Sequence, residues 1–510
     1  MLARLDALAD PRFVRTFALA FAACLALTIL AAIFSDGVYH ADEYFQISEF
    51  VGLKLGRLTG ADLPWEYGSR VRPWLQPGIY YVVARLLEAV SVHDAFTMML
   101  AFRLLTGLTG VAALMLLALL ATTWVDDGAR RRAIAVTTAL TCFVPYLLVR
   151  TTSESLSAAF FVGGFALLSL WLGARGREPG PQGAAWPFLA GLLFGLAFEC
   201  RYQMAVPVVG FTVWAIKERR LGVTPVVWLA LGVALSVLGG SVIDAWGYGE
   251  PVFVPWNYLR VNLIEGKAAE FGVSPFYAYL YLMPALLPPW GLLATLTLVV
   301  FWWQNPRHSL TWVSLPLVLV HCLIGHKEER FLFPIYGMIP AMFVLVSWRS
   351  AWHLVPPEKS LAPIRAPIRV GVYCLNFVFL AALVTLPVRV PIKTARFIYR
   401  AFPDRFEVYT IGRYDPVSIW HRSLRFAAPP AYVRHGLDGL DAVVKASNES
   451  PAPIYYASRL PLTDEDQARF AGRPALVYSF RPRFLDALGS FKWVDRIDWA
   501  CLYRIEPPPR

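Results

Sequence analysis

"VAALMLLALLATTW" (residues 111–124) and "VGVYCLNFVFLAALVTLPV" (residues 370–388) are two of several long runs in this chain without a single Asp, Glu, Lys or Arg. A helix of about 20 apolar residues spans the hydrocarbon core of a bilayer, so such runs predict transmembrane helices. The composition agrees, because 57% of the 510 residues are hydrophobic and only 16% are charged. Soluble domains are typically about 45–50% apolar and about 25% charged. We therefore predict a mainly α-helical, polytopic membrane protein.

About eleven segments are apolar enough to be transmembrane helices by this criterion. They are residues 13–34, 98–123, 133–149, 155–173, 187–201, 203–217, 223–243, 277–303, 309–325, 331–348 and 368–389. The first follows three arginines and resembles a signal peptide, but it is long for an apolar signal core and lacks a small-residue cleavage site, so we expect a retained helix. The segment 77–92 is ambiguous because Arg85 and Glu88 interrupt it. It either spans the membrane or lies in the interface as an amphipathic helix.

The basic loops favour the second alternative. If residues 77–92 do not span, every short Arg/Lys-rich loop falls on the cytoplasmic side, as the positive-inside rule requires. These loops are residues 126–132, 173–180, 217–220, 305–308 and 348–369. The opposite face then receives residues 35–97, 150–155, 199–203, 244–276 and 325–331, and everything after about residue 390. Loop orientation and contact with anionic lipid explain the net charge of +11, so we predict no nucleic-acid partner.

The chain is expected to have two domains. Residues 1–390 form the transmembrane domain, with residues 35–97 as its first extracytoplasmic loop. Residues 391–510 contain turn-rich segments such as "PLTDEDQARFAGRP" (461–474) and β-like runs such as "APIYYAS" (452–458), which indicate a small mixed α/β extracytoplasmic domain. The six cysteines are scattered and form no CxxC motif, so neither a disulfide framework nor a zinc site is predicted.

Unusual polar residues gather on the extracytoplasmic face. "HADEYFQ" (40–46) places Asp42 and Glu43 just beyond the first span, either as a solvated loop or as a catalytic carboxylate at the mouth of a cavity. The same loop holds "LPWEYGSRVRPWLQPG" (63–78), whose aromatic and charged residues form either an interfacial belt or a surface for sugar and phosphate.

Two further motifs lie between apolar runs on this face. In "HKEERFLFP" (326–334), His326, Lys327 and Arg330 are candidates for holding a phosphate, and the alternative is a snorkelling interfacial turn. "FECRYQ" (198–203) places Glu199 beside Arg201, a pair that more often forms a helix-terminal ion pair than a ligand site.

"HADEYFQ" resembles the His-Pro-Asp-Glu-aromatic-aromatic-Gln signature of glycosyltransferase family 22. This family comprises the polyprenyl-phosphate-mannose-dependent α-mannosyltransferases of N-glycan and GPI-anchor assembly. Residues 63–78, "RTTSES" (150–155), the block 244–280 and "HKEERFLFP" are similar to four further family motifs, in the same order. The resemblance covers residue 13 to about 390. Ala41 departs from the family's proline, Glu154 from its asparagine, and "RYQ" (201–203) from an Arg-Pro-Thr-like triplet.

The resemblance implies a GT-C membrane fold with an extracytoplasmic active site and a polyprenyl-phosphate sugar donor. It implies transfer with inversion to a glycan or glycolipid acceptor, with the sugar being mannose. Asp42 is then the expected base and Glu43 its support, or the reverse. His326, Lys327 and Arg330 are the expected ligands of the donor phosphate, with Arg201 and Arg72 as secondary candidates. The remaining substrate-binding candidates are His40, Trp65, Glu66, Tyr67, Trp74 and Glu328.

Other features complete the expectation. No Gly-rich nucleotide loop or DxD motif is visible, which favours a lipid-phosphate donor over a nucleotide sugar. A divalent metal near Asp42 would be compatible with this chemistry, although no cluster of ligands indicates one. The alternative function is a transporter or flippase of a lipid-linked sugar, which predicts ionisable residues near the middle of spans rather than at their ends. The Ala/Arg/Gly-rich composition suggests a bacterial inner membrane, with the active site facing the periplasm.

Overall fold

The computed structural model describes residues 6–173, 183–219, 221–347, 358–388, 391–419, 422–480 and 500–508. Most of the predicted basic loop 173–180, residue 220, and residues 348–357 of the loop 348–369 lie outside these ranges. The chain divides into two compact units. Unit 1 is Met1–Ser35, Leu63–Leu86 and Leu100–Leu386, and unit 2 is Asp36–Asp62, Leu87–Met99 and Pro387–Arg510. The predicted domain boundary at residue 390 lies close to the end of unit 1 and stays a prediction.

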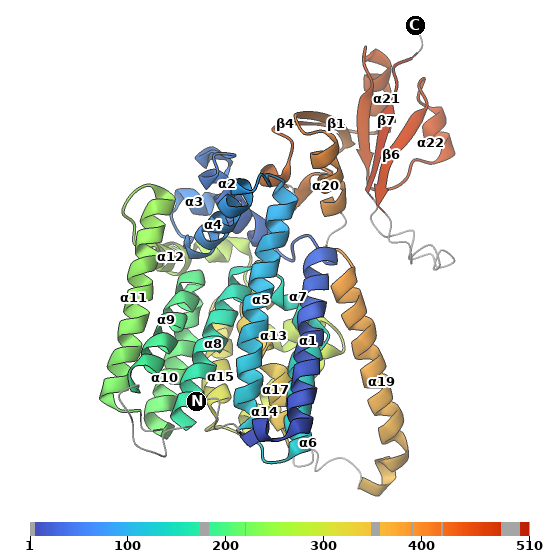
Figure 1. Ribbon diagram of the computed structural model, residues 1–510. Helices are drawn as coiled ribbons and strands as arrows, with labels where there is room; N and C mark the ends of the chain where they lie inside the picture. Colours follow the sequence, from blue (N-terminus) through green and yellow to red (C-terminus); the bar gives the residue numbers. More distant parts are fainter. Residues whose placement is uncertain are drawn as a thin grey trace. The chain divides into compact units, whose positions relative to one another are not determined.

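Long helices dominate unit 1 (Figure 1). They and the shorter helices connected to them are α1 (Pro11–Phe34), α3 (Trp65–Gly68), α4 (Leu75–Ala89), α5 (Ala95–Thr122), α6 (Gly128–Leu140), α7 (Phe143–Leu148), α8 (Ser153–Gly173), α9 (Ala185–Cys200), α10 (Ala205–Arg219), α11 (Val223–Tyr248), α12 (Val254–Leu259), α13 (Tyr279–Leu286), α14 (Trp290–Gln304), α15 (Ser309–Leu323), α16 (Phe333–Tyr336), α17 (Ile339–Leu345) and α19 (Glu358–Thr385). Helix α1 begins where the sequence provides a cap: Asp10 accepts the backbone N–H of Arg12 at 2.9 Å, and Pro11 occupies the first turn.

Within the described residues, four helices are long and apolar enough to cross a membrane: α1, α5, α8 and α11. Shorter apolar helices are α9, α14, α15 and the Val370–Thr385 part of α19. The predicted span 277–303 is broken into α13 and α14 around Pro288 and Pro289, which cannot donate backbone hydrogen bonds. The predicted spans 133–149 and 331–348 are also divided, the first between α6 and α7 and the second between α16 and α17. The expected count of about eleven spans therefore stays a prediction.

The core of unit 1 includes buried aromatic side chains between α8, α9 and α10. Phe161 and Phe165 of α8 lie 5.5 Å and 4.7 Å (ring centroids) from Phe194 of α9 and Phe211 of α10, respectively. The rings of Phe194 and Phe211 are 6.0 Å apart in an edge-to-face arrangement, which aromatic pairs favour. This packing holds together the helices whose ends, at Ser153 and Cys200, carry the polar residues described below.

Unit 2 joins helices to a five-stranded sheet. It contains α2 (Glu49–Lys54), α20 (Pro391–Ala401), β1 (Arg405–Ile411), β2 (Ser418–Ile419), β3 (Arg422–Ser423), β4 (Ala431–Leu437), α21 (Leu440–Glu449), β5 (Ile454–Ser458), α22 (Asp464–Ala468), β6 (Pro474–Phe480) and β7 (Ala500–Ile505). The strand order is β4-β1-β5-β7-β6, with β4, β1 and β5 parallel and the remaining pairs antiparallel. Val443 of α21 packs against Tyr456, Tyr503 and Ile505 of the sheet. The predicted class, mainly α-helical with a small mixed α/β part, is confirmed.

Candidate active site

The two adjacent carboxylates of "HADEYFQ" have different surroundings within unit 2. Glu43 is 1% exposed, and its Oε1 accepts the backbone N–H groups of Tyr39 at 2.6 Å and His40 at 3.3 Å. Glu43 therefore holds the turn that precedes it. The Asp42 side chain is 20% exposed, and its Oδ1 lies 3.4 Å from Nδ1 of His40. Of the two carboxylates, Asp42 is the one that a substrate can reach.

Two residues of this segment, one just before the motif and one within it, were not among the site candidates predicted from the sequence. Asp36 is fully buried; one of its oxygens is 3.0 Å from Nζ of Lys393 and the other pairs with Arg396, both on α20. The fully buried Tyr44 accepts the backbone N–H of Ala427 at 2.7 Å, and burial raises the pKa of its hydroxyl well above the usual value. These contacts tie the segment that carries "HADEYFQ" to the C-terminal part of unit 2. The only sequence signal was an aspartate directly after a span.

A second group of charged residues lies in unit 1, and we call it the Glu154 cluster. Its members are Glu154, Arg201, His326, Glu328 and Arg330. Oε1 of the fully buried Glu154 is 2.9 Å from Nη1 of Arg201 and 3.6 Å from Nη1 of Arg330. Glu328 pairs with Arg330 through one oxygen, and its other oxygen is 2.8 Å from Nε2 of His326. The cluster thus brings together three predicted phosphate ligands and the predicted substrate-binding residue Glu328. At its centre is Glu154, which the sequence analysis noted only as a departure from the family motif.

The net charge of this cluster depends on His326. Two guanidinium groups face two carboxylates, so a protonated imidazole makes the balance positive. The hydrogen bond to Glu328 raises the pKa of His326 above its usual value, although partial burial opposes this. Arg201 and Arg330 also lie 4.8 Å and 5.4 Å from the ring centroid of Phe331. The cluster is therefore a fixed, partly neutralised group of cations.

Lys327 lies apart from these ion pairs. It is 9% exposed, and its Nζ donates to the carbonyl oxygens of Ile324 at 2.6 Å and Ser274 at 3.0 Å. Ile324 follows the last residue of α15, where backbone carbonyls lack helical partners and attract cations. In this arrangement Lys327 caps a helix, and its predicted role at the donor phosphate stays a prediction.

A third group, the Trp74 cluster, comprises Glu66, Tyr67, Arg72, Trp74, Asp244, Trp246 and Tyr248 in unit 1. The backbone N–H of Trp74 donates to Oδ1 of Asp244 at 2.7 Å, and the Trp74 ring is edge-on to Trp246 and Tyr248. Gly247 makes this possible, since a Cβ there would lie 2.1 Å from the Trp74 ring. Trp74 is fully buried, so the structure does not support its predicted stacking on a sugar.

The other predicted residues of this loop remain closer to the surface. Arg72 is held by Glu66, with 3.6 Å between their charged atoms, and by two hydrogen bonds between its backbone and the Tyr248 hydroxyl. Trp65 is half-buried and stacks on Phe271 at 6.1 Å, and Phe271 in turn lies 6.2 Å from the His326 ring. Trp65 is thereby linked to the Glu154 cluster through one aromatic ring.

The helix-terminal interpretation predicted an ion pair between Glu199 and Arg201. In the structure, Arg201 pairs with Glu154 instead. Arg201 follows the last residue of α9 in an extended conformation (φ −155°, ψ 113°), and its side chain reaches Glu154 and the Ser153 hydroxyl at the start of α8. Glu199 is 1% exposed and lies against Gly240 of α11, where a Cβ would be 2.2 Å from Oε2. The backbone conformation at the helix end therefore separates the two side chains.

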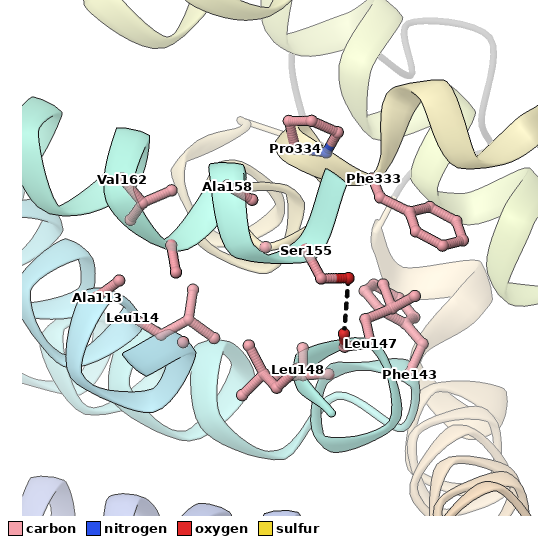
Figure 2. A pocket seen from close by; sticks show the side chains of 14 residues that line it. Ala113, Leu114, Phe143, Leu147, Leu148, Ser155, Ala158, Val162, Phe333 and Pro334 are labelled. Atoms are coloured by element: carbon pink, nitrogen blue, oxygen red, sulfur yellow. Dashed lines mark hydrogen bonds between the residues drawn. The ribbon is translucent and has the colours of Figure 1, made fainter. Parts of the chain in front are cut away.

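Two further observations concern metal sites and cavities. In the described parts of the chain, no group of three or more His, Cys, Asp or Glu side chains could hold a metal ion. Figure 2 shows an apolar cavity in unit 1, where the Ser155 hydroxyl donates to the carbonyl of Leu147 at 3.1 Å. With a volume of about 40 Å³, the cavity is far smaller than a small-molecule site of about 300–1,000 Å³, so we interpret it as a packing gap.

The long apolar helices, with charged clusters at their ends, define an integral membrane protein. The sequence profile of the Alg9-like mannosyltransferase family matches residues 19–403, and the chain belongs to this family. GPI mannosyltransferase 3 of Yarrowia lipolytica is 28% identical over 324 residues, which are 62% of this chain and 59% of that protein. Alpha-1,2-mannosyltransferase ALG9 of Mus musculus is 27% identical over 211 residues, or 38% of this chain and 33% of that protein.

A solved structure has the same fold. ArnT from Cupriavidus metallidurans in the apo state aligns with a TM-score of 0.52, covering 98% of this chain and 100% of that chain. The sequence identity is only 14%, so this likeness concerns the fold and not the substrates.

Proposed function

We propose that this protein is a membrane mannosyltransferase that transfers mannose from a polyprenyl-phosphate donor to an extracytoplasmic glycan or glycolipid acceptor. Family membership over residues 19–403 carries the proposal, and two similar proteins, GPI mannosyltransferase 3 and alpha-1,2-mannosyltransferase ALG9, support mannose as the sugar. ArnT, which shares the fold, has also been crystallised bound to undecaprenyl phosphate. Ionisable residues gather at the ends of helices, which favours transfer over transport of a lipid-linked sugar. A bacterial inner membrane, with the site facing the periplasm, is part of the proposal.

In the proposed mechanism, Asp42 takes the proton of the acceptor hydroxyl. The hydroxyl oxygen then forms a bond to the anomeric carbon as the bond between that carbon and the phosphate oxygen breaks, with inversion. The partial exposure of Asp42 and its contact with His40 support this role. Glu43 is the positioning residue, because its carboxylate holds the backbone of the same turn.

The leaving polyprenyl phosphate needs cations as its charge develops. We assign this role to the Glu154 cluster, in which Arg201, Arg330 and His326 are held in place by Glu154 and Glu328. Arginine suits the task, since its planar fork matches phosphate oxygens. Trp65, which is linked to this cluster through Phe271, is the better candidate for stacking on a sugar than the buried Trp74.

The test is transfer of radiolabelled mannose from a polyprenyl-phosphate donor in membranes that contain wild type, Asp42→Asn or Asp404→Asn at matched protein levels. Asp404 is an exposed aspartate of unit 2 and serves as the control. We expect Asp42→Asn to lose at least about 100-fold in rate, as general-base catalysis contributes about 10²–10⁴-fold, and the control to retain full activity. Full transfer by Asp42→Asn would exclude Asp42 as the base, and a wild type without transfer would contradict the proposed donor. Parallel assays with EDTA test whether a divalent metal is needed.

A further inference from the structure

The end of α10 and the start of α15 lie against each other in unit 1. A Cβ at Gly210 of α10 would lie 2.2 Å from the carbonyl oxygen of Trp312 in α15, so the two backbones approach closely. The indole N–H of Trp214 in α10 donates to the carbonyl of Arg307 at 2.8 Å. The indole N–H of Trp312 donates to the carbonyl of Pro306 at 3.1 Å. The two tryptophans therefore hold the loop before α15 in place beside the end of α10.

Both tryptophans carry a cation on the ring. Nζ of Lys217 lies 5.3 Å from the ring centroid of Trp312. The guanidinium carbon of Arg219 lies 5.5 Å from the ring centroid of Trp214. A cation within about 6 Å of an aromatic face is attracted to it, so the rings restrict where these charges lie. The exposed Arg307, whose carbonyl is bound by Trp214, adds a third positive residue.

This positive charge is not neutralised by the protein. Among the described residues, no carboxylate forms an ion pair with Lys217, Arg219 or Arg307, and all three are exposed. Glu218 lies between the first two in the sequence, but its exposed side chain pairs with neither of them in the described structure. The last carbonyl groups of α10 attract cations, but a helix end is equivalent to only about half an elementary charge. Most of the charge therefore faces an anion outside the protein.

An exposed apolar stripe on α10 leads to these cations. Val209, Val213 and Ile216 are exposed, and their spacing places them on one face of the helix. Lys217 lies four residues after Val213 and so belongs to the same face. Because residues 203–217 are a predicted span, this face is expected to contact lipid tails. Tryptophans are typical of the membrane–water interface, which puts the cations at the level of the lipid head groups.

A phospholipid with a net negative charge fits both parts of this surface. Its phosphate suits the planar fork of arginine and the point charge of lysine, and its acyl chains cover the apolar stripe. Basic pockets between membrane helices are a recognised form of lipid head-group site. Residues 217–220 and 305–308 are both predicted to be cytoplasmic, so the lipid is expected in the cytoplasmic leaflet.

We propose that Lys217, Arg219 and Arg307 form a binding site for the head group of one anionic phospholipid. The site includes none of the residues assigned to sugar transfer, and the proposal does not depend on that reaction. A lipid bound there bridges the end of α10 and the loop before α15, so it stabilises this part of unit 1.

The experiment is native mass spectrometry of the purified full-length protein in detergent. The probes are phosphatidylglycerol and phosphatidylcholine with the same acyl chains. We expect the first molecule of phosphatidylglycerol to bind at least about tenfold more tightly than phosphatidylcholine. The double variant Lys217→Gln/Arg219→Gln should weaken binding of phosphatidylglycerol by at least about tenfold, a loss of about 1.4 kcal/mol. The matched control is Arg12→Gln/Arg15→Gln, which removes the same charge from exposed positions of α1 on the same predicted side.

The control separates a specific site from a general attraction of charge. An equal loss in both double variants would show that only net charge matters, and it would overturn the proposal. Unchanged binding of phosphatidylglycerol by Lys217→Gln/Arg219→Gln, or equal binding of the two lipids by wild type, overturns it as well. Displacement of the bound lipid by millimolar inorganic phosphate would reveal a site for soluble anions instead.

A charge-keeping variant excludes misfolding as the cause of the loss. Lys217→Arg/Arg219→Lys retains both cations, so it should bind phosphatidylglycerol nearly as tightly as wild type and melt at an unchanged temperature. Failure of this variant to bind the lipid would contradict a site based on charge.

Discussion

Glu154 shows how one substitution within a motif changes the meaning of its neighbours. The family motif that "RTTSES" (150–155) resembles has asparagine at this position. Here a fully buried carboxylate contacts Arg201 and Arg330. Two buried guanidinium groups are costly unless they are paired. The acid therefore holds the arginines in place and lowers the net charge that they offer to a phosphate.

Glu154→Gln should destabilise the protein, because it leaves the two arginines without their shared counter-charge. Breaking a buried ion pair by removing one partner costs about 3–5 kcal/mol. Melting temperatures in detergent would measure the loss, with Glu218→Gln as a control at an exposed position of α10. A double-mutant cycle with Arg201→Gln should reveal strong coupling. Additive effects of the two changes would contradict the pairing.

His326 should make stability depend on pH. In the folded protein, the hydrogen bond to Glu328 raises the pKa of the His326 imidazole above its value in the unfolded chain, which is about 6.5. A group whose pKa is higher in the folded than in the unfolded state stabilises the folded state, and this contribution is complete at pH values below the unfolded pKa. It is lost as the pH rises through the folded pKa. The difference in melting temperature between wild type and His326→Gln should therefore be largest below the unfolded pKa and become smaller as the pH rises through the raised pKa of His326 in the folded protein. The exposed His93, changed to Gln, is the control. A difference that does not vary with pH would contradict the proton-linked contact.

At the scale of elements, α11 packs closely against the loop before α4 because residue 247 is a glycine. A Cβ at residue 247 would lie 2.1 Å from the Trp74 ring, whereas one at Gly239 on the same helix would meet nothing within 4 Å. Gly247→Ala should displace Trp74 and cost about 1–3 kcal/mol, the usual penalty for overpacking. Gly239→Ala should leave the melting temperature nearly unchanged. Equal melting temperatures for the two variants would show that the Trp74 cluster accommodates the added methyl group, and would contradict the prediction.

The apolar runs predicted helices well but not their continuity. α1, α5, α8 and α11 agree with long uninterrupted runs, since length and composition alone determine such spans. The segments 277–303 and 331–348, which contain Pro288, Pro289 and Pro340, have the hydropathy of single spans and are divided in the structure, whereas α15 continues through Pro316. A hydropathy average is little changed by one proline, but the helix loses a backbone hydrogen bond there because proline has no N–H.

For the whole molecule, ordered motifs predicted the family, but not which side chains meet. His326 was a candidate because it lies in a polar motif between apolar runs, and Arg201 became one only through the family resemblance. Arg330 meets Glu154, which lies more than a hundred residues earlier in the chain, and Arg201 meets the same acid because α8 packs against α9. Likewise, the capping role of Lys327 depends on the path of the chain after α15. Residue type was thus predictable, and pairing was not.

The orientation of the chain rests on the same balance of charge and can be tested directly. The positive-inside rule predicts that the loop at residues 126–132 is cytoplasmic and that everything after about residue 390 lies on the other face. In a variant with its six native cysteines replaced by serine, Asn448→Cys should react with a membrane-impermeant maleimide in intact bacterial spheroplasts. Asp126→Cys should react only after permeabilisation, because both positions are exposed and differ only in side. The reverse pattern would put Asp42 and the Glu154 cluster on the cytoplasmic face. Their proposed chemistry would then need a donor and an acceptor on that face.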